Sequence, residues 1–216
     1  MIELPPVGAR DRTGVTMARR AVTRREALDL SAGLFATNGY KASSLELVAE
    51  RLGVTRQALY YHFENKGQIL AALFDELMTK LESAVAAVPV DPVIGGEPRF
   101  VAMLRAHVDV TISNTDLGSV LLHERAAMVK MKDLHANKRR REYANLFTAA
   151  YAEGVAAGRL KDIDPWIAVS TLISAVNGVT SWYQGERVPG STDLFKSTVV
   201  RLLGDGYRVA AVPAST

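Results

Sequence analysis

The chain has 216 residues, of which 48% are hydrophobic and 23% are charged, and its net charge is +3. These proportions match globular proteins and argue against wholesale disorder. Because the chain has no cysteine, it has no disulfide, no thiolate zinc site and no cysteine nucleophile. Neither a signal sequence nor an apolar run of the ~20 residues that cross a bilayer is present. We therefore expect a soluble, cytoplasmic protein that has no membrane partner.

The first 22 residues mix Pro, Gly and Arg without a steady period, which predicts a flexible basic arm. Its arginines suit either a DNA groove or a solvated tail. A helix is predicted next, from Thr23 to Asn38. Thr23 and Glu26 have the spacing of a capping box, apolar residues follow at helical spacing, and Gly39 is placed to end the helix.

Residues 44–63, SLELVAERLGVTRQALYYHF, predict two short helices around a tight turn. Ser43 or Ser44 caps the first helix, Gly53 can adopt the left-handed conformation that ends it, and Thr55 caps the second. The outer face of the second helix presents polar and aromatic side chains: Arg56, Gln57, Tyr60, Tyr61 and His62. These side chains behind a glycine turn suit a helix-turn-helix that enters DNA, and the alternative is an ordinary helical hairpin.

Asn65 can cap a long helix from about residue 66 to 88, and the Pro and Gly residues between 89 and 98 predict a surface loop. Further helices are predicted at about 99–114, 116–130, 132–157, 165–186 and 191–207. The period-two alternation of strands is absent from this part of the chain. The fold class is therefore predicted to be all-α.

The predicted helix 165–186 is apolar on more than one face, and the helix after it has an apolar face as well. A helix of this kind must be covered on more than one side. One side can meet the chain's own core, while the other meets a second subunit or lines a cavity. We predict a homodimer formed through residues 165–207.

Residues 23–70 resemble the DNA-binding domain of TetR-type transcriptional repressors. The resemblance rests on Ala32, Leu34-Phe35, Gly39-Tyr40, Ser44, Val48-Ala49, Gly53-Val54, the run LYYHFENK at 59–66 and Leu70. It implies an all-helical dimer in which a three-helix N-terminal domain binds DNA and a C-terminal helical domain binds an effector and dimerises. We therefore divide the chain into an arm (1–22), a DNA-binding domain (23–68) and a ligand-binding and dimerisation domain (69–216).

The resemblance also implies which residues touch double-stranded operator DNA. Thr55, Arg56 and Gln57 would face base edges or phosphates, with Arg56 suited to guanine and Gln57 to adenine. The residues expected near the phosphate backbone are Ser44, Tyr60, Tyr61, His62 and Lys66. For Tyr60 the alternative is packing under the helix, and for His62 it is a structural hydrogen bond.

The C-terminal half resembles an acyl-CoA-responsive subgroup of these repressors through three short features: KRRREY at 138–143, Gly154 with Gly158, and SWY at 181–183. The cations of Lys138–Arg141 could bind phosphates of such an effector, or they could form a solvated face with ion pairs. Four consecutive helical residues cannot all point at one ligand. The effector pocket is predicted to include Met103, His107, His123, Arg140, Phe147, Trp182 and Tyr183.

Nothing in the sequence predicts an enzyme. The four histidines form no metal-binding pair, and neither a nucleophile elbow nor a phosphate-binding glycine motif is present. We expect no catalytic residue, metal or cofactor. The leading hypothesis is a repressor released from a palindromic operator by a small hydrophobic or acyl-CoA-type effector. The alternatives are an effector-independent dimeric DNA-binding protein and a helical enzyme.

Overall fold

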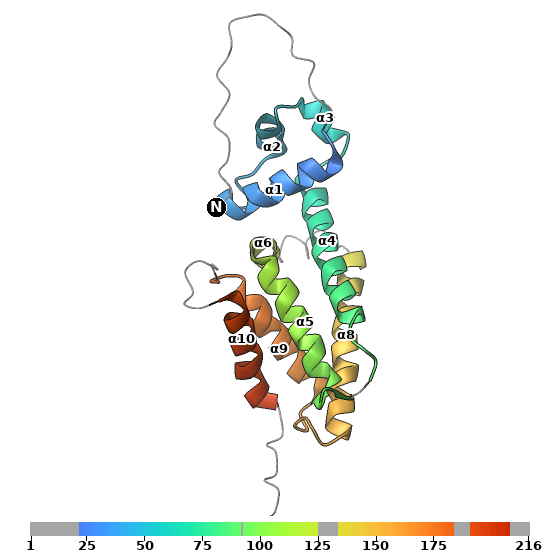
Figure 1. The fold of residues 1–216 in the computed structure, drawn as a ribbon. Helices are drawn as coiled ribbons and strands as arrows, with labels where there is room; N and C mark the ends of the chain where they lie inside the picture. The colour runs from blue at the N-terminus through green and yellow to red at the C-terminus, as the bar shows by residue number, and fades with distance from the viewer. Residues whose placement is uncertain (1–21, 92, 125–133, 184–190, 208–216) are drawn as a thin grey trace, which may run out of the picture. The chain divides into compact units, whose positions relative to one another are not determined.

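A computed structural model describes residues 22–91, 93–124, 134–183 and 191–207 (Figure 1). The all-α class predicted from the sequence is confirmed. The helices are α1 (Arg24–Asn38), α2 (Leu45–Leu52), α3 (Arg56–Tyr60), α4 (Lys66–Ala86), α5 (Arg99–Ser113), α6 (Thr115–His123), α8 (Leu134–Ala156), α9 (Pro165–Val179) and α10 (Thr192–Tyr207). The chain divides into two compact units, of which the first ends at Leu70 and the second begins at Ala71. The predicted basic arm lies outside the described residues, apart from Val22.

In the first unit, side chains cap each of the three short helices. The Thr23 hydroxyl oxygen accepts a hydrogen bond from the Glu26 N–H, and the Glu26 carboxylate accepts one from the Thr23 N–H, which completes the predicted capping box of α1. Ser44 accepts from the Leu47 N–H at the start of α2, and Thr55 accepts from the Ala58 N–H at the start of α3. These bonds satisfy N–H groups that have no partner inside a helix.

Between α2 and α3, Gly53 has a φ of 68° and ends α2 in the left-handed conformation. This conformation suits glycine because it has no Cβ. The turn brings α2 against α3, and the two helices share a core with α1. The most deeply buried apolar side chains of that core are Ala27, Leu34, Phe35, Val48, Leu59 and Phe63.

The segment predicted as a surface loop, residues 89–98, contains a minimal hairpin. Strand β1 (Val93–Ile94) pairs antiparallel with β2 (Glu97–Pro98). Gly95 and Gly96, with φ values of 57° and 85°, form the turn between the strands. Two successive residues of positive φ match the twist of a two-residue hairpin turn. The strands are too short to show the alternation that identifies a strand in a sequence.

In the second unit, α5 packs against α8, α9 and α10 (Figure 1). Its inner face is fully buried at Phe100, Val101, Met103, Leu104 and Val108. Phe100 makes edge-on ring contacts with Phe147 and Tyr151 of α8. A polar link joins α10 to α5 as well, because Lys196 lies 3.3 Å from Asp109.

Two helices of the second unit end earlier than predicted. Helix α9 ends at Val179 instead of residue 186, and the hydroxyls of Thr180 and Ser181 donate to the Asn177 and Gly178 carbonyls at this end. Side-chain hydroxyls compete in this way for the last carbonyls of a helix. Helix α6 ends at His123, and most of the remainder of its predicted range lies outside the described residues.

Candidate functional sites

Two fully buried residues pack the inner side of the short helix α3, and of the turn that follows it, into the core of the first unit. Leu59 and Phe63 are at most 1% exposed, and the Arg24 guanidinium covers the Phe63 ring at 4.9 Å from its centroid. The opposite face of the helix therefore points to solvent. Arg56 and Gln57 are exposed there, and Tyr61, just after the helix, is 87% exposed.

Arg56 is held in place by two neighbours. Its guanidinium lies 2.6 Å from a Glu46 carboxylate oxygen and donates to the Tyr60 hydroxyl at 3.0 Å. It also covers the Tyr60 ring, 5.1 Å from the centroid. The hydrogen bond to Tyr60 and the charge of Glu46 raise the pKa of Arg56 above its already high ordinary value. The site thus presents a permanent cation in a preset orientation.

Four of the other side chains predicted to touch DNA have partners within the first unit. Ser44 and Thr55 are the helix caps described above. The Nε2 atom of His62 lies 2.8 Å from the Val22 carbonyl oxygen. The Lys66 ammonium donates to the Tyr40 and Lys41 carbonyls and lies 4.5 Å from the centroid of the Tyr40 ring. Among the predicted DNA contacts, the exposed residues are Ser44, Arg56, Gln57 and Tyr61.

The second unit contains a cavity of about 240 Å³. It lies between α4, α5, α6, α8 and α9, and its lining is mostly apolar. The apolar side chains are Phe74, Leu77, Met78, Leu81, Leu121, Leu122, Ala144 and Ile173. A few polar groups interrupt this lining, which is the pattern of small-molecule sites. They include His107, Tyr143, Asn177 and Arg140.

Of the predicted pocket residues, the structure places His107 and Arg140 on the cavity wall. Phe147 is fully buried behind the wall, with its ring 5.9 Å from that of His107, and Met103 is buried as well. The other three lie away from the cavity. His123 is exposed, Trp182 is 59% exposed, and the Tyr183 ring stacks on Phe195 at 4.2 Å.

Other residues of the cavity wall were not predicted from the sequence, among them Phe74 and Leu77 of α4 and the polar residues Tyr143 and Asn177. The apolar stripe of α4 was visible, but the same stripe would pack a solid core. A useful signal was the position of Tyr143 and Asn177, which are polar groups on the buried sides of their helices.

His107 and Tyr143 form a buried polar pair. His107 is 1% exposed, and its Nδ1 atom lies 2.9 Å from the Tyr143 hydroxyl oxygen. Burial lowers the pKa of His107 to about 4, against a smaller opposing effect of the Asn177 side chain. Burial also raises the pKa of the Tyr143 phenol. Both groups are therefore neutral at pH 7.

This burial predicts that stability falls between pH 6.5 and pH 4. In that window the unfolded chain protonates His107 at its ordinary pKa of 6.5, while the folded chain keeps the ring neutral. Its contribution is fully present above pH 6.5 and disappears as the pH falls to 4. Between pH 7.5 and pH 5 the wild type should lose about 2 kcal/mol of unfolding free energy more than His107→Gln. Urea unfolding at both pH values measures the difference, and equal losses would contradict the assignment.

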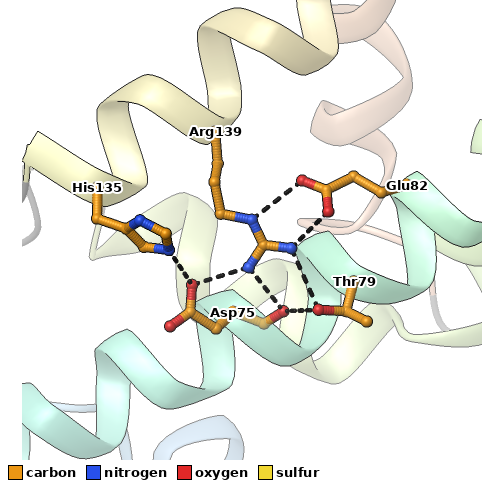
Figure 2. A network of polar contacts seen from close by, with 5 residues as sticks. All are labelled: Asp75, Thr79, Glu82, His135 and Arg139. Atoms are coloured by element: carbon orange, nitrogen blue, oxygen red, sulfur yellow. Dashed lines mark hydrogen bonds and ion pairs between the residues drawn. The ribbon is translucent and has the colours of Figure 1, made fainter.

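The basic run at 138–141 points in several directions, as expected for consecutive helical residues. Arg139, at 17% side-chain exposure, joins α8 to α4: its guanidinium contacts the Glu82 carboxylate at 2.6 and 3.0 Å, Asp75 at 2.9 Å and Thr79 at 3.2 Å (Figure 2). The hydrogen bond to Glu82 is the largest effect that raises the pKa of Arg139. Lys138 is exposed and lies 3.7 Å from Glu142. Arg140 alone of the four lines the cavity, where it covers the Phe74 ring and contacts Asn137.

Replacing Arg139 with Met should lower the unfolding free energy by about 1–2 kcal/mol, because it leaves two neighbouring carboxylates without their shared cation. The cost is moderated by solvent, since Asp75 and Glu82 are 46% and 38% exposed. The matched control Lys138→Met removes an exposed pair and should change stability by less than about 0.5 kcal/mol. Urea denaturation compares the two variants. Equal effects would show that the contacts of Arg139 with Asp75 and Glu82 contribute no more to stability than an exposed ion pair.

The outer faces of α9 and α10, together with the turn after α9, expose several large apolar side chains: Trp166, Ile167, Trp182, Leu194 and Leu202. Each is more than half exposed, and the Trp182 ring lies 5.8 Å from that of Phe195. Several large, exposed apolar side chains on two packed helices typically mark a contact with another protein. We call these five residues the α9–α10 patch.

Two other kinds of site are not found in the part of the chain that the structure describes. No group of His, Asp and Glu side chains there is arranged to hold a metal ion. None of the described helices combines the length and apolar character needed to cross a membrane.

Comparison with known proteins matches both units. Residues 27–73 match the family described as bacterial regulatory proteins, tetR family, and residues 95–188 match the tetracyclin repressor-like C-terminal domain. A TetR/AcrR-family transcriptional regulator of Thermobifida fusca is 31% identical, with a TM-score of 0.62 over 86% of this chain and 98% of that one.

Two further relatives extend over most of the chain. The HTH-type transcriptional repressor KstR2 of Rhodococcus jostii is 29% identical over 175 residues, which are 74% of this chain and 79% of the repressor. The solved structure of AibR with isovaleryl coenzyme A and operator DNA has a TM-score of 0.71 at 21% identity, and the match covers 83% of this chain and 96% of that one.

Proposed function

Because the chain belongs to the tetR family of bacterial regulatory proteins, whose relatives are transcriptional regulators and not enzymes, we propose that it is a ligand-released repressor. Dimers bind a palindromic operator, and a small hydrophobic or acyl-CoA-type effector in the cavity releases them. Residues 23–68 contact the DNA, and residues 69–216 bind the effector and dimerise.

The observation that carries this proposal is the position of the cavity along α4. This helix is continuous from Lys66 to Ala86, so it begins in the DNA-binding unit and contributes Phe74, Leu77, Met78 and Leu81 to the cavity wall. A ligand that binds more tightly to one arrangement of α4 shifts the population of the two arrangements. The ligand can change operator affinity only as far as its own affinity differs between the two arrangements of α4.

Support for a dimer comes from the α9–α10 patch. A two-fold dimer uses the same surface on both subunits, so an apolar patch on two adjacent helices can cover itself. Two α3 helices then enter successive major grooves about one helical turn apart, which requires a palindromic operator.

Support for an acyl-CoA effector comes from the cavity and from one structural neighbour. The AibR structure contains isovaleryl coenzyme A together with operator DNA. In this chain the cavity offers an apolar interior, and Arg140 on its wall supplies a cation for a phosphate group.

The test uses the DNA that flanks the gene. DNase footprinting with the full chain should protect a palindromic site, and fluorescence anisotropy should then show release on titration with acyl-CoAs from isovaleryl-CoA to palmitoyl-CoA. Protection without release by any of these compounds would contradict the effector assignment and favour an effector-independent DNA-binding protein.

A further inference from the structure

One buried polar atom on the cavity wall has no partner. No described residue lies within hydrogen-bond distance of the Nε2 atom of His107, although the ring is 1% exposed, and the Asn177 side chain is near enough only for the smaller effect on the pKa of the ring. The side chain lines the cavity, as do Tyr143 and Asn177. A buried donor or acceptor without a partner is unfavourable, so such an atom beside a cavity suits a ligand group.

The hydrogen bond to Tyr143 indicates which of the two ring nitrogens of His107 carries the proton. The Tyr143 hydroxyl makes one hydrogen bond among the described residues, to His107 Nδ1. If the hydroxyl donates, Nδ1 accepts and Nε2 carries the ring proton, so one donor stays unpaired. In the other tautomer the Tyr143 proton and the Nε2 lone pair are both unpaired. The first arrangement leaves fewer unsatisfied buried groups and is favoured. Nε2 therefore carries the ring proton and is a donor on a side chain that lines the cavity.

The partner of this donor is a neutral acceptor. The imidazole is uncharged at pH 7, and most of the surface of the cavity wall is apolar. A neutral donor does not compensate the burial of a carboxylate, and Arg140, the cation on this wall, already contacts Asn137 and the Phe74 ring. A carbonyl oxygen needs one donor and carries no charge. The acyl thioester class of effector supplies such an oxygen.

The size of the cavity agrees with a short acyl group. Its volume of about 240 Å³ lies below the ~300–1,000 Å³ that is typical of ligand pockets, which favours a short chain over a long one. Arg140, on the same wall, keeps its contact with Asn137 and still presents a cation to the nucleotide part of a thioester.

We propose that His107 determines the specificity of the cavity, because its Nε2–H donates a hydrogen bond to the carbonyl oxygen of a short-chain acyl thioester. Tyr143 is the positioning residue that fixes the ring tautomer. This inference rests on the proposed function, since it names the group by which the effector is recognised.

The test compares isovaleryl-CoA with its thioether analogue, S-(3-methylbutyl)-CoA, which differs only in lacking the carbonyl oxygen. Isothermal titration calorimetry with the full chain should show at least tenfold tighter binding of the thioester, because the thioether leaves the buried donor unpaired. Equal affinity for the two compounds, or no binding of either, overturns the proposal.

Variants identify the residue responsible. In His107→Leu the ratio of thioester to thioether affinity should fall to about one. His107→Gln, whose amide can still donate, should keep part of the preference for the thioester. In Tyr143→Phe the preference should fall to an intermediate value because the tautomer is no longer fixed. The control Leu77→Ala should weaken both ligands by the same factor. If His107→Leu keeps the wild-type preference for the thioester, the proposal is overturned. If that variant does not fold, the ratio of the two affinities measured with the wild type decides.

Failure of this inference can be distinguished from failure of the proposed function. Operator binding and release are measured separately by anisotropy, and release by the thioether as readily as by the thioester would leave the repressor intact while removing the role of His107. Absence of a protected operator would contradict the repressor itself, whatever the ligand ratio.

Discussion

Replacing Arg56 with Ala should lower operator affinity by roughly 30-fold or more without changing the fold or the dimer. Arg56 is exposed on α3 and is held by Glu46 and Tyr60, so its guanidinium is oriented before DNA arrives. A bidentate contact to a base contributes about 1–3 kcal/mol of discrimination. A dimer with two recognition helices loses this contribution twice. Anisotropy with the footprinted duplex measures the loss.

The matched control for this prediction is Arg51→Ala. Arg51 is an exposed arginine in the last turn of α2, so its removal lowers the positive charge of the unit equally. It should reduce affinity by a few-fold, as expected for a lost phosphate interaction, and should weaken operator and unrelated DNA alike. Equal losses for Arg51→Ala and Arg56→Ala would show that α3 contributes only charge.

Introducing two carboxylates into the α9–α10 patch, by Leu194→Glu with Leu202→Glu, should convert the protein to a monomer and abolish operator binding in the nanomolar range. Both leucines are more than half exposed on α10, so the isolated subunit can accept glutamate there. In the dimer the same carboxylates would be buried without cations, which is strongly unfavourable. Sedimentation velocity measures the oligomeric state, and anisotropy measures the loss of DNA binding.

The control for the dimer prediction is Leu146→Glu. Leu146 is 49% exposed and lies on α8, which contributes no residue to the patch. This variant should remain dimeric and should bind the operator as the wild type does. If the double variant stays dimeric, the two subunits associate through another surface.

Local signals made the first unit predictable. Each helix start there is determined by a side chain that caps it, namely Thr23, Ser44 and Thr55, and the end of α2 is determined by Gly53. These interactions span at most four residues, so they can be recognised in one sequence. The Arg56 cluster was not predicted in the same way, because Glu46 reaches it from another helix.

The cavity depends on interactions between residues that are far apart in the chain. Side chains from five helices determine whether α4 packs tightly against the other helices or leaves a cavity. The hydrophobic periodicity of a sequence does not show how completely those side chains fill the space. The pairing of His107 with Tyr143 spans 36 residues, and that of Arg139 with Glu82 spans 57. The sequence marked His107 and Arg140 as candidates, but it could not show that Arg139 faces α4 while Arg140 faces the cavity.

The coupling between the two units is tested most directly by measuring the affinity of isovaleryl-CoA with and without saturating operator. By linkage, if the thioester lowers operator affinity by some factor, the operator must lower thioester affinity by the same factor. We expect equal factors of about 5–150-fold, corresponding to coupling of about 1–3 kcal/mol. The same thioester affinity in the presence and absence of operator would contradict a ligand-released repressor.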